Sequence, residues 1–305
     1  MITYVHMNRT FIIGVLMLLS APLYSETLTY TTSFAGSEYG KYHIAVLRAA
    51  IAETQDTHGE MQVRRHVLPM TQSRQVVTLL KGQGDVMWSV TSDALEQRLL
   101  PVRFPLLQGF GGYRVFVIHK NMQPFFQPTQ SLAHIRNLVS VQGEDWPDFA
   151  ILKDNQFKVA GSGWTNWYTT MYKSLERGMV DYFPRNIVEV HRDMEYHKNP
   201  HLVIEQNHML VYPSYEFFFV SPARPELQKR LEEGMVRLLE NGKLSELFRQ
   251  NSEHRKALKL LDDSPRVIHR LHNNVLSYSL KYPNWEATPQ QSLDEFRRLQ
   301  QHAGL

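Results

Sequence analysis

Hydroxyl side chains that follow a predicted strand are the first residues in this sequence whose type and position suggest chemistry. Thr91 and Ser92 come directly after the β-rich segment Asp85–Val90 and just before a predicted helix. Such hydroxyls, together with the free backbone N–H groups of a helix N-terminus, can bind an anionic group of a ligand. They can equally be ordinary helix caps. The segment therefore predicts a ligand contact, a cap, or residues that do both.

A histidine-rich segment further along the chain contains residue types that ligate transition metals. It holds His191, Glu195, His197 and His201, and imidazole and carboxylate groups are common metal ligands. Their spacing matches neither a His-Glu-x-x-His helix nor a zinc finger. A polar loop is the ordinary explanation, so we expect no metal in this protein.

Catalytic and nucleotide-binding motifs are also missing from the sequence. Ala160–Gly163 lacks the Gly-x-Ser-x-Gly spacing of a nucleophile elbow. Gly109–Gly112 precedes a predicted strand, whereas a dinucleotide-binding loop follows one. No Walker A sequence occurs, and the absence of Cys removes thiol nucleophiles and thiolate ligands. Glu144 is the one residue worth testing as a catalytic acid or base. We therefore predict a protein without a cofactor and without enzymatic activity.

Strands and helices that could position these residues alternate along the first part of the chain. Apolar residues recur at helical spacing in two segments, and β-rich runs precede and follow them. The predicted elements are a strand at 28–33, a helix at 41–54, a strand at 61–68, a helix at 71–81 and a strand at 85–90. This alternation predicts an α/β fold with a mostly parallel sheet.

One pattern occurs twice. Leu79–Trp88 matches Leu175–Phe183 in residue type and spacing, because each is a helix that ends at Gly and turns through Asp into a strand. Glycine relieves the left-handed position at a helix C-terminus. Any helix-to-strand connection can end in this way, but the recurrence suggests two similarly built lobes.

The first 25 residues have the composition of a secretory signal peptide. Arg9 is their only Lys or Arg, and the apolar stretch Phe11–Leu19 is followed by small residues up to Ser25. A transmembrane anchor is the alternative, but spanning a bilayer takes roughly 20 apolar residues. Since there is no Cys to carry a lipid, we expect cleavage near Ser25 and a soluble periplasmic protein.

Two apolar runs, Tyr113–His119 and Tyr215–Val220, have the length of buried strands and bracket a second lobe. The predicted divisions are a signal peptide at 1–25, lobe 1 at 26–112 with 220–250, lobe 2 with the hinge strands at 113–219, and a helical C-terminal extension at 251–305. The composition suits such a fold, since 43% of the 305 residues are hydrophobic and 21% are charged. The net charge of +3 is too balanced for a dedicated nucleic-acid binder.

In this order, the motifs resemble those of the family 3 solute-binding proteins. In the first half they are Gly82–Asp85, Thr91, Arg98, Phe104-Pro105 and Gly112–Lys120; in the second half they are Ser131-Leu132, Val139–Gly143, Leu175–Asp181 and Gly242–Phe248. The resemblance spans roughly residues 28 to 250. It implies the type 2 periplasmic-binding-protein fold, in which two α/β lobes joined by two crossover strands close over a ligand.

The resemblance also implies positions for ligand contacts. Family members often stack an aromatic ring on the ligand from the loop that holds Phe34 and Tyr39 here, although a packed loop aromatic is equally consistent. In amino-acid-binding members an Arg shortly after the Thr holds the ligand carboxylate. Arg98 lies farther from Thr91 than that pattern requires, and a place on the solvent face is its alternative.

Arg185 departs from the family pattern more sharply. The amino-acid binders place an acidic residue near this position to hold the ligand ammonium, whereas here a cation follows Asp181. If Arg185 points into the cleft, a carboxylate or another anionic ligand is favoured; an exposed ion-paired Arg is the alternative. Trp164, Trp167 and Glu144 are secondary candidates beside the strand ends of lobe 2, with core packing the alternative for the two Trp.

Three functions fit this sequence. The leading hypothesis is a periplasmic protein that captures a small molecule, such as an amino acid or organic acid, for an ABC permease. The second is a sensory module of the same fold that is read by a membrane receptor. The third is an enzyme, dehydratase-like, on the same fold. Nucleic acid is not an expected partner.

Overall fold

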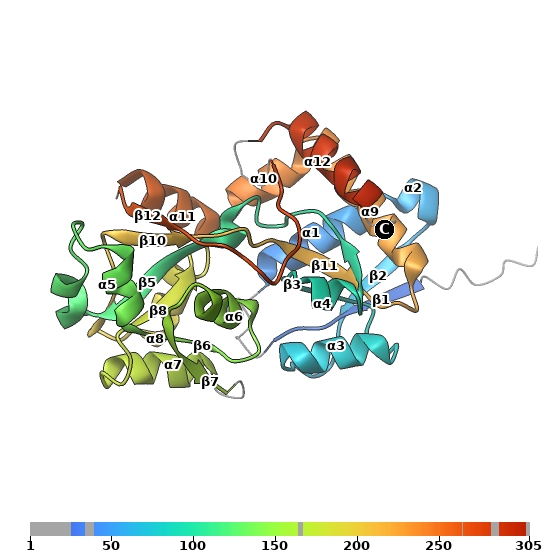
Figure 1. The fold of residues 1–305 in the computed structure, drawn as a ribbon. Helices are drawn as coiled ribbons and strands as arrows, with labels where there is room; N and C mark the ends of the chain where they lie inside the picture. Colours follow the sequence, from blue (N-terminus) through green and yellow to red (C-terminus); the bar gives the residue numbers. More distant parts are fainter. Residues whose placement is uncertain (1–25, 34–39, 164–166, 264, 282–286, 303–305) are drawn as a thin grey trace, which may run out of the picture.

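The computed structural model describes residues 26–33, 40–163, 167–263, 265–281 and 287–302. They form two α/β lobes that lie side by side (Figure 1). This is the two-lobed α/β architecture expected from the sequence. The predicted signal peptide, residues 1–25, lies outside the described residues.

The first lobe is built on a five-stranded sheet with the order β2-β1-β3-β11-β4. Its strands are β1 (Glu26–Tyr30), β2 (Met61–Arg65), β3 (Val86–Val90), β4 (Leu100–Val102) and β11 (Glu216–Val220). Strand β1 runs parallel to β2 and β3, and β11 runs antiparallel to β3 and β4.

Helices cover both faces of this sheet, because its buried strands are apolar on both sides. Phe217 and Phe219 of β11 pack with Leu79 of α3 (Gln72–Leu80) on one face. Phe218 and Val220 belong to the cluster on the opposite face, where α1 (Lys41–Ala52) and α9 (Pro225–Glu240) pack against each other. The short helices α2 (Gln55–His58) and α4 (Asp93–Glu96) complete the lobe.

The second lobe is built on a seven-stranded sheet with the order β12-β10-β5-β8-β6-β7, and β9 pairs with β5 beside this path. Its strands are β5 (Tyr113–His119), β6 (Val139–Gly143), β7 (Lys158–Ser162), β8 (Tyr182–Asn186), β9 (Leu202–Ile204), β10 (His208–Val211) and β12 (Val267–Arg270). Its helices are α5 (Leu132–Asn137), α6 (Pro147–Asp154), α7 (Trp167–Glu176) and α8 (Val190–His197).

The two lobes share one strand order. Strands β2-β1-β3-β11 correspond to β7-β6-β8-β5, and in each lobe the fourth strand is antiparallel to the third. The repeated helix-Gly-Asp-strand pattern lies at the same place in both: Gly82 and Gly178 end α3 and α7 with φ of 65° and 64°. These left-handed values are the ones that glycine adopts without strain.

The chain crosses between the lobes at two places that touch each other. It passes from β4 to β5 through residues 103–112 and returns from β10 to β11 through residues 212–215. A Cβ on Gly112 would lie 2.0 Å from the carbonyl oxygen of Tyr212, and one on Gly111 would lie 2.5 Å from that of Ser214. Strand β5 pairs wholly within the second sheet and β11 wholly within the first. The sequence-based division grouped residues 113–219 as lobe 2 with the hinge strands, and β11 is the hinge strand that belongs to the first sheet.

The C-terminal segment packs on both lobes. Helix α11 (Ser252–Asp263) contacts α8 and also α10 (Lys243–Gln250), and β12 adds a strand to the second sheet parallel to β10. Helix α12 (Pro289–His302) lies on α9 of the first lobe. The sequence predicted helices in this segment but not β12. Among the described residues, no helix is both long and apolar enough to cross a membrane.

Candidate functional site

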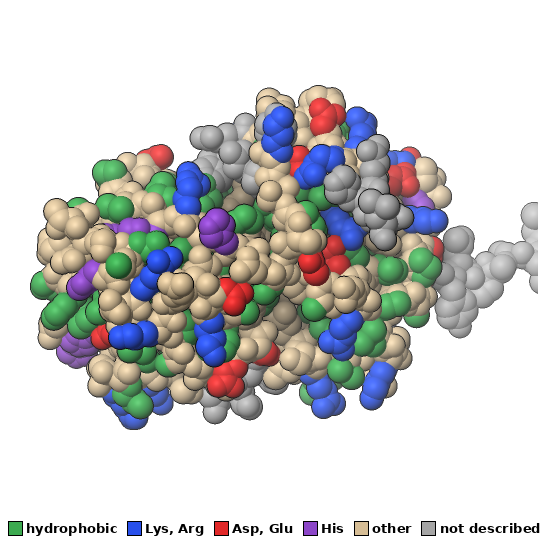
Figure 2. Space-filling view, viewed as in Figure 1, with side chains coloured by type: hydrophobic (Ala, Val, Ile, Leu, Met, Phe, Trp, Pro, Cys, Tyr) green, Lys and Arg blue, Asp and Glu red, His purple; other side chains and the backbone are tan. Residues whose placement is uncertain are grey.

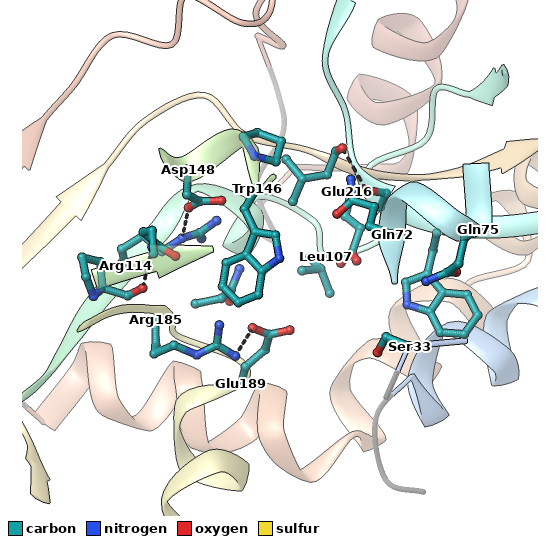
Figure 3. A pocket seen from close by; sticks show the side chains of 17 residues that line it. Ser33, Gln72, Gln75, Leu107, Arg114, Trp146, Asp148, Arg185, Glu189 and Glu216 are labelled. Carbon is teal, nitrogen blue, oxygen red and sulfur yellow. Dashed lines mark hydrogen bonds and ion pairs between the residues drawn. The ribbon is translucent and has the colours of Figure 1, made fainter. Parts of the chain in front are cut away.

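A cavity of about 120 Å³ lies between the lobes (Figure 3). From the first lobe and the crossing segment it is lined by Ser33, Gln72, Gln75, Trp88, Ser89, Val90, Leu107 and Glu216; from the second lobe and its start at β5, by Arg114, Gln142, Trp146, Pro147, Asp148, Pro184, Arg185, Asn186 and Glu189. Many of these residues end or follow parallel strands, which is where open α/β sheets bind ligands.

Arg185 lies in the cavity wall with its charge already paired. Its Nε donates to Oδ2 of Asp193 at 2.7 Å, and its Nη2 donates to Oε2 of Glu189 at 2.8 Å. Burial by itself would lower the pKa of Arg185, but the two carboxylates raise it well above its ordinary value. Burial likewise opposes ionisation of Asp193, yet Arg185 and Arg192 hold the pKa of its carboxyl below the usual range. The guanidinium is therefore always charged and always neutralised.

Arg114 forms a second buried ion pair in the same wall. Its Nε donates to Oδ1 of Asp148 at 2.7 Å, its Nη1 donates to the carbonyl oxygen of Gly111 at 2.6 Å, and the hydroxyl of Tyr212 also donates to Asp148. Although burial works against it, Arg114 keeps the pKa of the Asp148 carboxyl low. This pair joins α6 to the crossing segments at the back of the cavity.

Glu216 supplies a carboxylate from the first lobe. It faces Nε2 of His43 at 3.0 Å, and the His43 ring stacks on Trp88 with centroids 5.2 Å apart and planes 7° from parallel. On the other side of the cavity, Trp146 lies beneath the guanidinium of Arg185 at 5.8 Å. Each lobe thus contributes an indole ring to the cavity wall.

Two buried acceptors in the lining lack hydrogen-bond partners among the described residues. Gln142 uses its amide nitrogen to donate to the carbonyl oxygen of Pro184 at 3.0 Å, which leaves its Oε1 without a donor. The hydroxyl of Ser33 is in the same situation. Because a buried polar atom without a partner is destabilising by about 1–3 kcal/mol, both groups are suited to meet donors of a bound molecule.

The charges of the cavity wall sum to an excess of acid. The lining contains Arg114 and Arg185 against Asp148, Glu189 and Glu216, and both Arg are held by carboxylates. The undescribed segments 34–39 and 164–166 contain no Lys, Arg or His. On the face in Figure 2, basic and acidic side chains are interspersed. No unpaired cation is therefore available within the described lining to receive an anionic ligand.

The structure distributes the predicted residues unevenly around this cavity. Arg185 lines it. Thr91 is buried outside it and donates to Glu96 at 2.6 Å, while Ser92 caps α4 by accepting the N–H of Leu95 at 3.2 Å. Ser92 thus acts as the capping alternative describes, whereas Thr91 is bound to the Glu96 side chain and is not the cap of α4. Arg98 and Glu144 are exposed and absent from the lining, so the solvent-face alternative describes Arg98.

Other predicted residues are not described. Phe34, Tyr39 and Trp164 lie outside the described residues, and Trp167 begins α7 without a described side chain. In the histidine-rich segment, His197 stacks on Tyr172 with centroids 3.9 Å apart. Within the described ranges, no group of three His, Asp or Glu side chains is arranged to hold a metal ion.

Sequence reasoning missed most of the lining residues. Arg114 carried a usable signal, because it is a cation inside the apolar run Tyr113–His119 and such a charge needs a buried partner. Trp88 carried a weaker one, since it lies in β3, the strand that follows the Gly-Asp turn. Glu216 carried the same signal as Arg114, because it is a charge inside the apolar run Tyr215–Val220. Asp148, the partner of Arg114, had no distinguishing local pattern.

Comparisons with known proteins identify relatives by structure alone. No family model and no curated protein sequence matches this chain. An ancestral arginine-binding protein bound to arginine is 16% identical with a TM-score of 0.55, and the match covers 74% of this chain and 97% of that one. A histidine kinase sensor domain with similarity to periplasmic binding proteins is 16% identical with a TM-score of 0.54, covering 74% and 95%. A probable amino-acid ABC transporter extracellular-binding protein from Bacillus subtilis is 12% identical with a TM-score of 0.55, covering 74% and 97%.

These neighbours are matched over nearly their whole length, while about a quarter of the present chain has no counterpart in them. At 12–16% identity and TM-scores of 0.54–0.55, these matches show the fold. The resemblance to the family 3 solute-binding proteins is therefore confirmed at the level of fold, and this chain has the two-lobed α/β fold of the periplasmic binding proteins.

Proposed function

We propose that this protein captures a small polar molecule in the cavity between its lobes and delivers it to a membrane importer. The observation that carries the proposal is the composition of the cavity wall, in which each lobe contributes a Trp ring and hydrogen-bonding side chains. A ligand held in this way is desolvated and bridges the lobes, so that binding favours the closed arrangement.

The ligand class that suits this wall carries positive charge or several hydrogen-bond donors. Glu216 offers a carboxylate, of which Oε2 faces His43. Gln142 offers an amide oxygen that has no donor among the described residues, and the aromatic rings of Trp88 and Trp146 are the kind of group on which a cation can bind. The sequence favoured an anionic ligand because of Arg185, but that guanidinium is already bound by Asp193 and Glu189. One structural neighbour was determined with arginine bound, which is compatible with a guanidinium or ammonium ligand here.

A sensory role is the second candidate, because one neighbour is a histidine kinase sensor domain. Both roles require ligand capture by the same cavity. Both also place the protein outside the inner membrane, in keeping with the signal-peptide composition of residues 1–25. A catalytic role has less support, since the neighbours are binding proteins and the proposed catalytic residue Glu144 is exposed.

A thermal-shift screen tests the proposal. We expect arginine, agmatine and other guanidines or amines to raise the Tm by several degrees, because a ligand that binds only the folded state stabilises it by mass action. Glu216→Gln and Trp146→Ala are expected to reduce the shift, and Glu144→Gln, outside the lining, serves as the matched control. A shift produced by dicarboxylates but not by amines would contradict the proposed ligand class. No shift with either, and no small molecule in native mass spectra, would contradict ligand capture itself.

A further inference from the structure

The segment that follows α11 joins the two lobes beside the crossing strands (Figure 1). Residues 267–280, here called the strap, begin in the sheet of the second lobe and end in the core of the first. We propose that the strap restrains how far the two lobes can open. This inference concerns motion and does not depend on which ligand the cavity binds.

The first part of the strap is anchored to the second lobe by backbone hydrogen bonds. Strand β12 pairs with β10 over four residues, and the N–H of Leu271 donates to the carbonyl oxygen of Val211 at 2.9 Å. The side chain of Asn155 binds both backbone polar groups of His272. Its Nδ2 donates to the His272 carbonyl oxygen at 2.8 Å, and its Oδ1 accepts the His272 N–H at 3.2 Å. Leu271 is buried in the apolar cluster of this lobe.

The second part of the strap is anchored to α4 of the first lobe. The N–H of Asp93 donates to the carbonyl oxygen of Val275 at 3.0 Å. In return, the backbone N–H and the hydroxyl of Ser277 donate to the Asp93 carboxylate at 3.0 and 3.1 Å. The hydroxyl of Tyr278 donates to Glu96 at 2.6 Å, the same carboxylate that accepts from Thr91. The N-terminus of α4 is therefore hydrogen-bonded to the strap.

Apolar contacts reinforce the first-lobe anchor. Leu276 and Leu280 are buried against Phe217 and Phe219 of β11, and the N–H of Leu280 donates to the hydroxyl of Tyr215 at 2.8 Å. Burial of a Leu side chain removes apolar surface from water, which favours the packed state. The anchor is thus a packed part of the core, and its release would expose apolar surface.

The connection between the anchors is short. His272 is held by the second lobe and Val275 by the first, and three residues span at most about 11 Å when fully extended. Asn273 lies between them and donates to the carbonyl oxygen of Pro213, inside the crossing segment 212–215, at 2.7 Å. A rotation that separates α4 from β12 must therefore break the contacts of the strap with one lobe or stop when the link is taut.

Distance measurements between the lobes test this inference. Because the chain has no Cys, Lys81→Cys and Arg177→Cys place spin labels at exposed, equivalent positions just before Gly82 and Gly178. Double electron–electron resonance on the ligand-free protein is expected to give one narrow distance distribution. In the pair Asp93→Ala with Tyr278→Phe, which removes strap contacts while keeping the apolar packing, we expect a broader distribution with an added component at longer distance.

Asp56→Ala is the control, because it removes an ion pair with Arg237 inside the first lobe and should leave the distribution unchanged. Leu276→Ala provides a second, stronger release of the strap, and circular dichroism shows whether each variant is folded. The inference is overturned if both folded strap variants keep the distance distribution of the parent. Since no ligand is added, this outcome is independent of the proposed binding function.

Discussion

The carboxylates of Asp85 and Asp181 hold equivalent positions in the two lobes. Oδ2 of Asp85 accepts the backbone N–H of Thr29, and Oδ2 of Asp181 accepts that of Val139, both at 2.6 Å. The backbone N–H of each Asp in turn donates to the carbonyl oxygen of the same partner at 2.8 Å. Each Asp thereby fastens the start of its own strand to the first strand of its lobe.

Removal of either carboxylate should destabilise its lobe. Asp181→Ala is expected to lower the free energy of unfolding by about 1.5–3 kcal/mol, since it deletes a hydrogen bond to a charged group. Asp85→Ala should have a larger effect, because Asp85 also pairs with Arg224 at 3.0 Å. Urea unfolding followed by circular dichroism measures both, with Asp181→Asn, which keeps an acceptor, as the milder control. Equal stability of Asp181→Ala and the parent would refute this role.

Loss of Arg185 should leave a buried charge without compensation. Asp193 is fully buried and depends on Arg185 for its closest ion pair, at 2.7 Å. Arg185→Ala is therefore expected to lower the free energy of unfolding by about 3–5 kcal/mol. Arg98 is the control, because it is also an Arg that the sequence predicted as a ligand contact but its side chain is exposed. Arg98→Ala should change the free energy of unfolding by less than about 0.5 kcal/mol. If denaturant midpoints show the two variants to be equally stable, the buried pair contributes nothing.

Two buried histidines predict a loss of stability in mild acid. Burial, followed by its neighbours His208 and Arg136, lowers the pKa of His269 to about 4, and burial lowers that of His254 to about 3. Unfolded histidines titrate near 6.5, so the unfolded state binds more protons as the pH falls below that value. The contribution of the two histidines to the free energy of unfolding is therefore complete above pH 6.5 and declines as the pH falls toward 4.

The Tm should therefore drop by several degrees between pH 7 and pH 5. Carboxylates with lowered pKa values, such as Asp148 and Asp193, act only at lower pH because unfolded Asp titrates near 3.9. His269→Gln, which keeps a hydrogen-bonding group beside His208, should flatten the pH dependence of the Tm. If the Tm of this variant falls as steeply as that of the parent between pH 7 and pH 5, His269 is not a source of the acid sensitivity.

The contact between the crossing segments should not tolerate a side chain at Gly112. A Cβ there would lie 2.0 Å from the carbonyl oxygen of Tyr212, so Gly112→Ala must push the two segments apart. We expect a loss of at least about 1–3 kcal/mol, the usual range for overpacking. Gly163→Ala is the matched control, because no atom of the described residues, its chain neighbours apart, lies within 4 Å of its Cβ position. Equal thermal stability of the two variants would show that the crossing segments can separate freely.

The amino-acid sequence by itself determined the alternation of strands and helices between residues 28 and 90, the strand Tyr113–His119 and the duplicated Gly-Asp turn, all of which the structure contains. These features follow from residue periodicity and turn chemistry over short stretches, where each residue acts on its near neighbours. It also singled out Arg185, which lines the cavity.

Only the tertiary structure decided what surrounds these residues. It placed β11 in the first sheet, turned Thr91 toward Glu96, joined Arg114 to Asp148 over 34 positions of sequence, and laid the strap against α4. The charge of the cavity followed from such pairings, since an Arg that is held by carboxylates cannot be distinguished in sequence from one that awaits a ligand. Long-range contacts of this kind depend on how distant segments pack, and no local pattern encodes that packing.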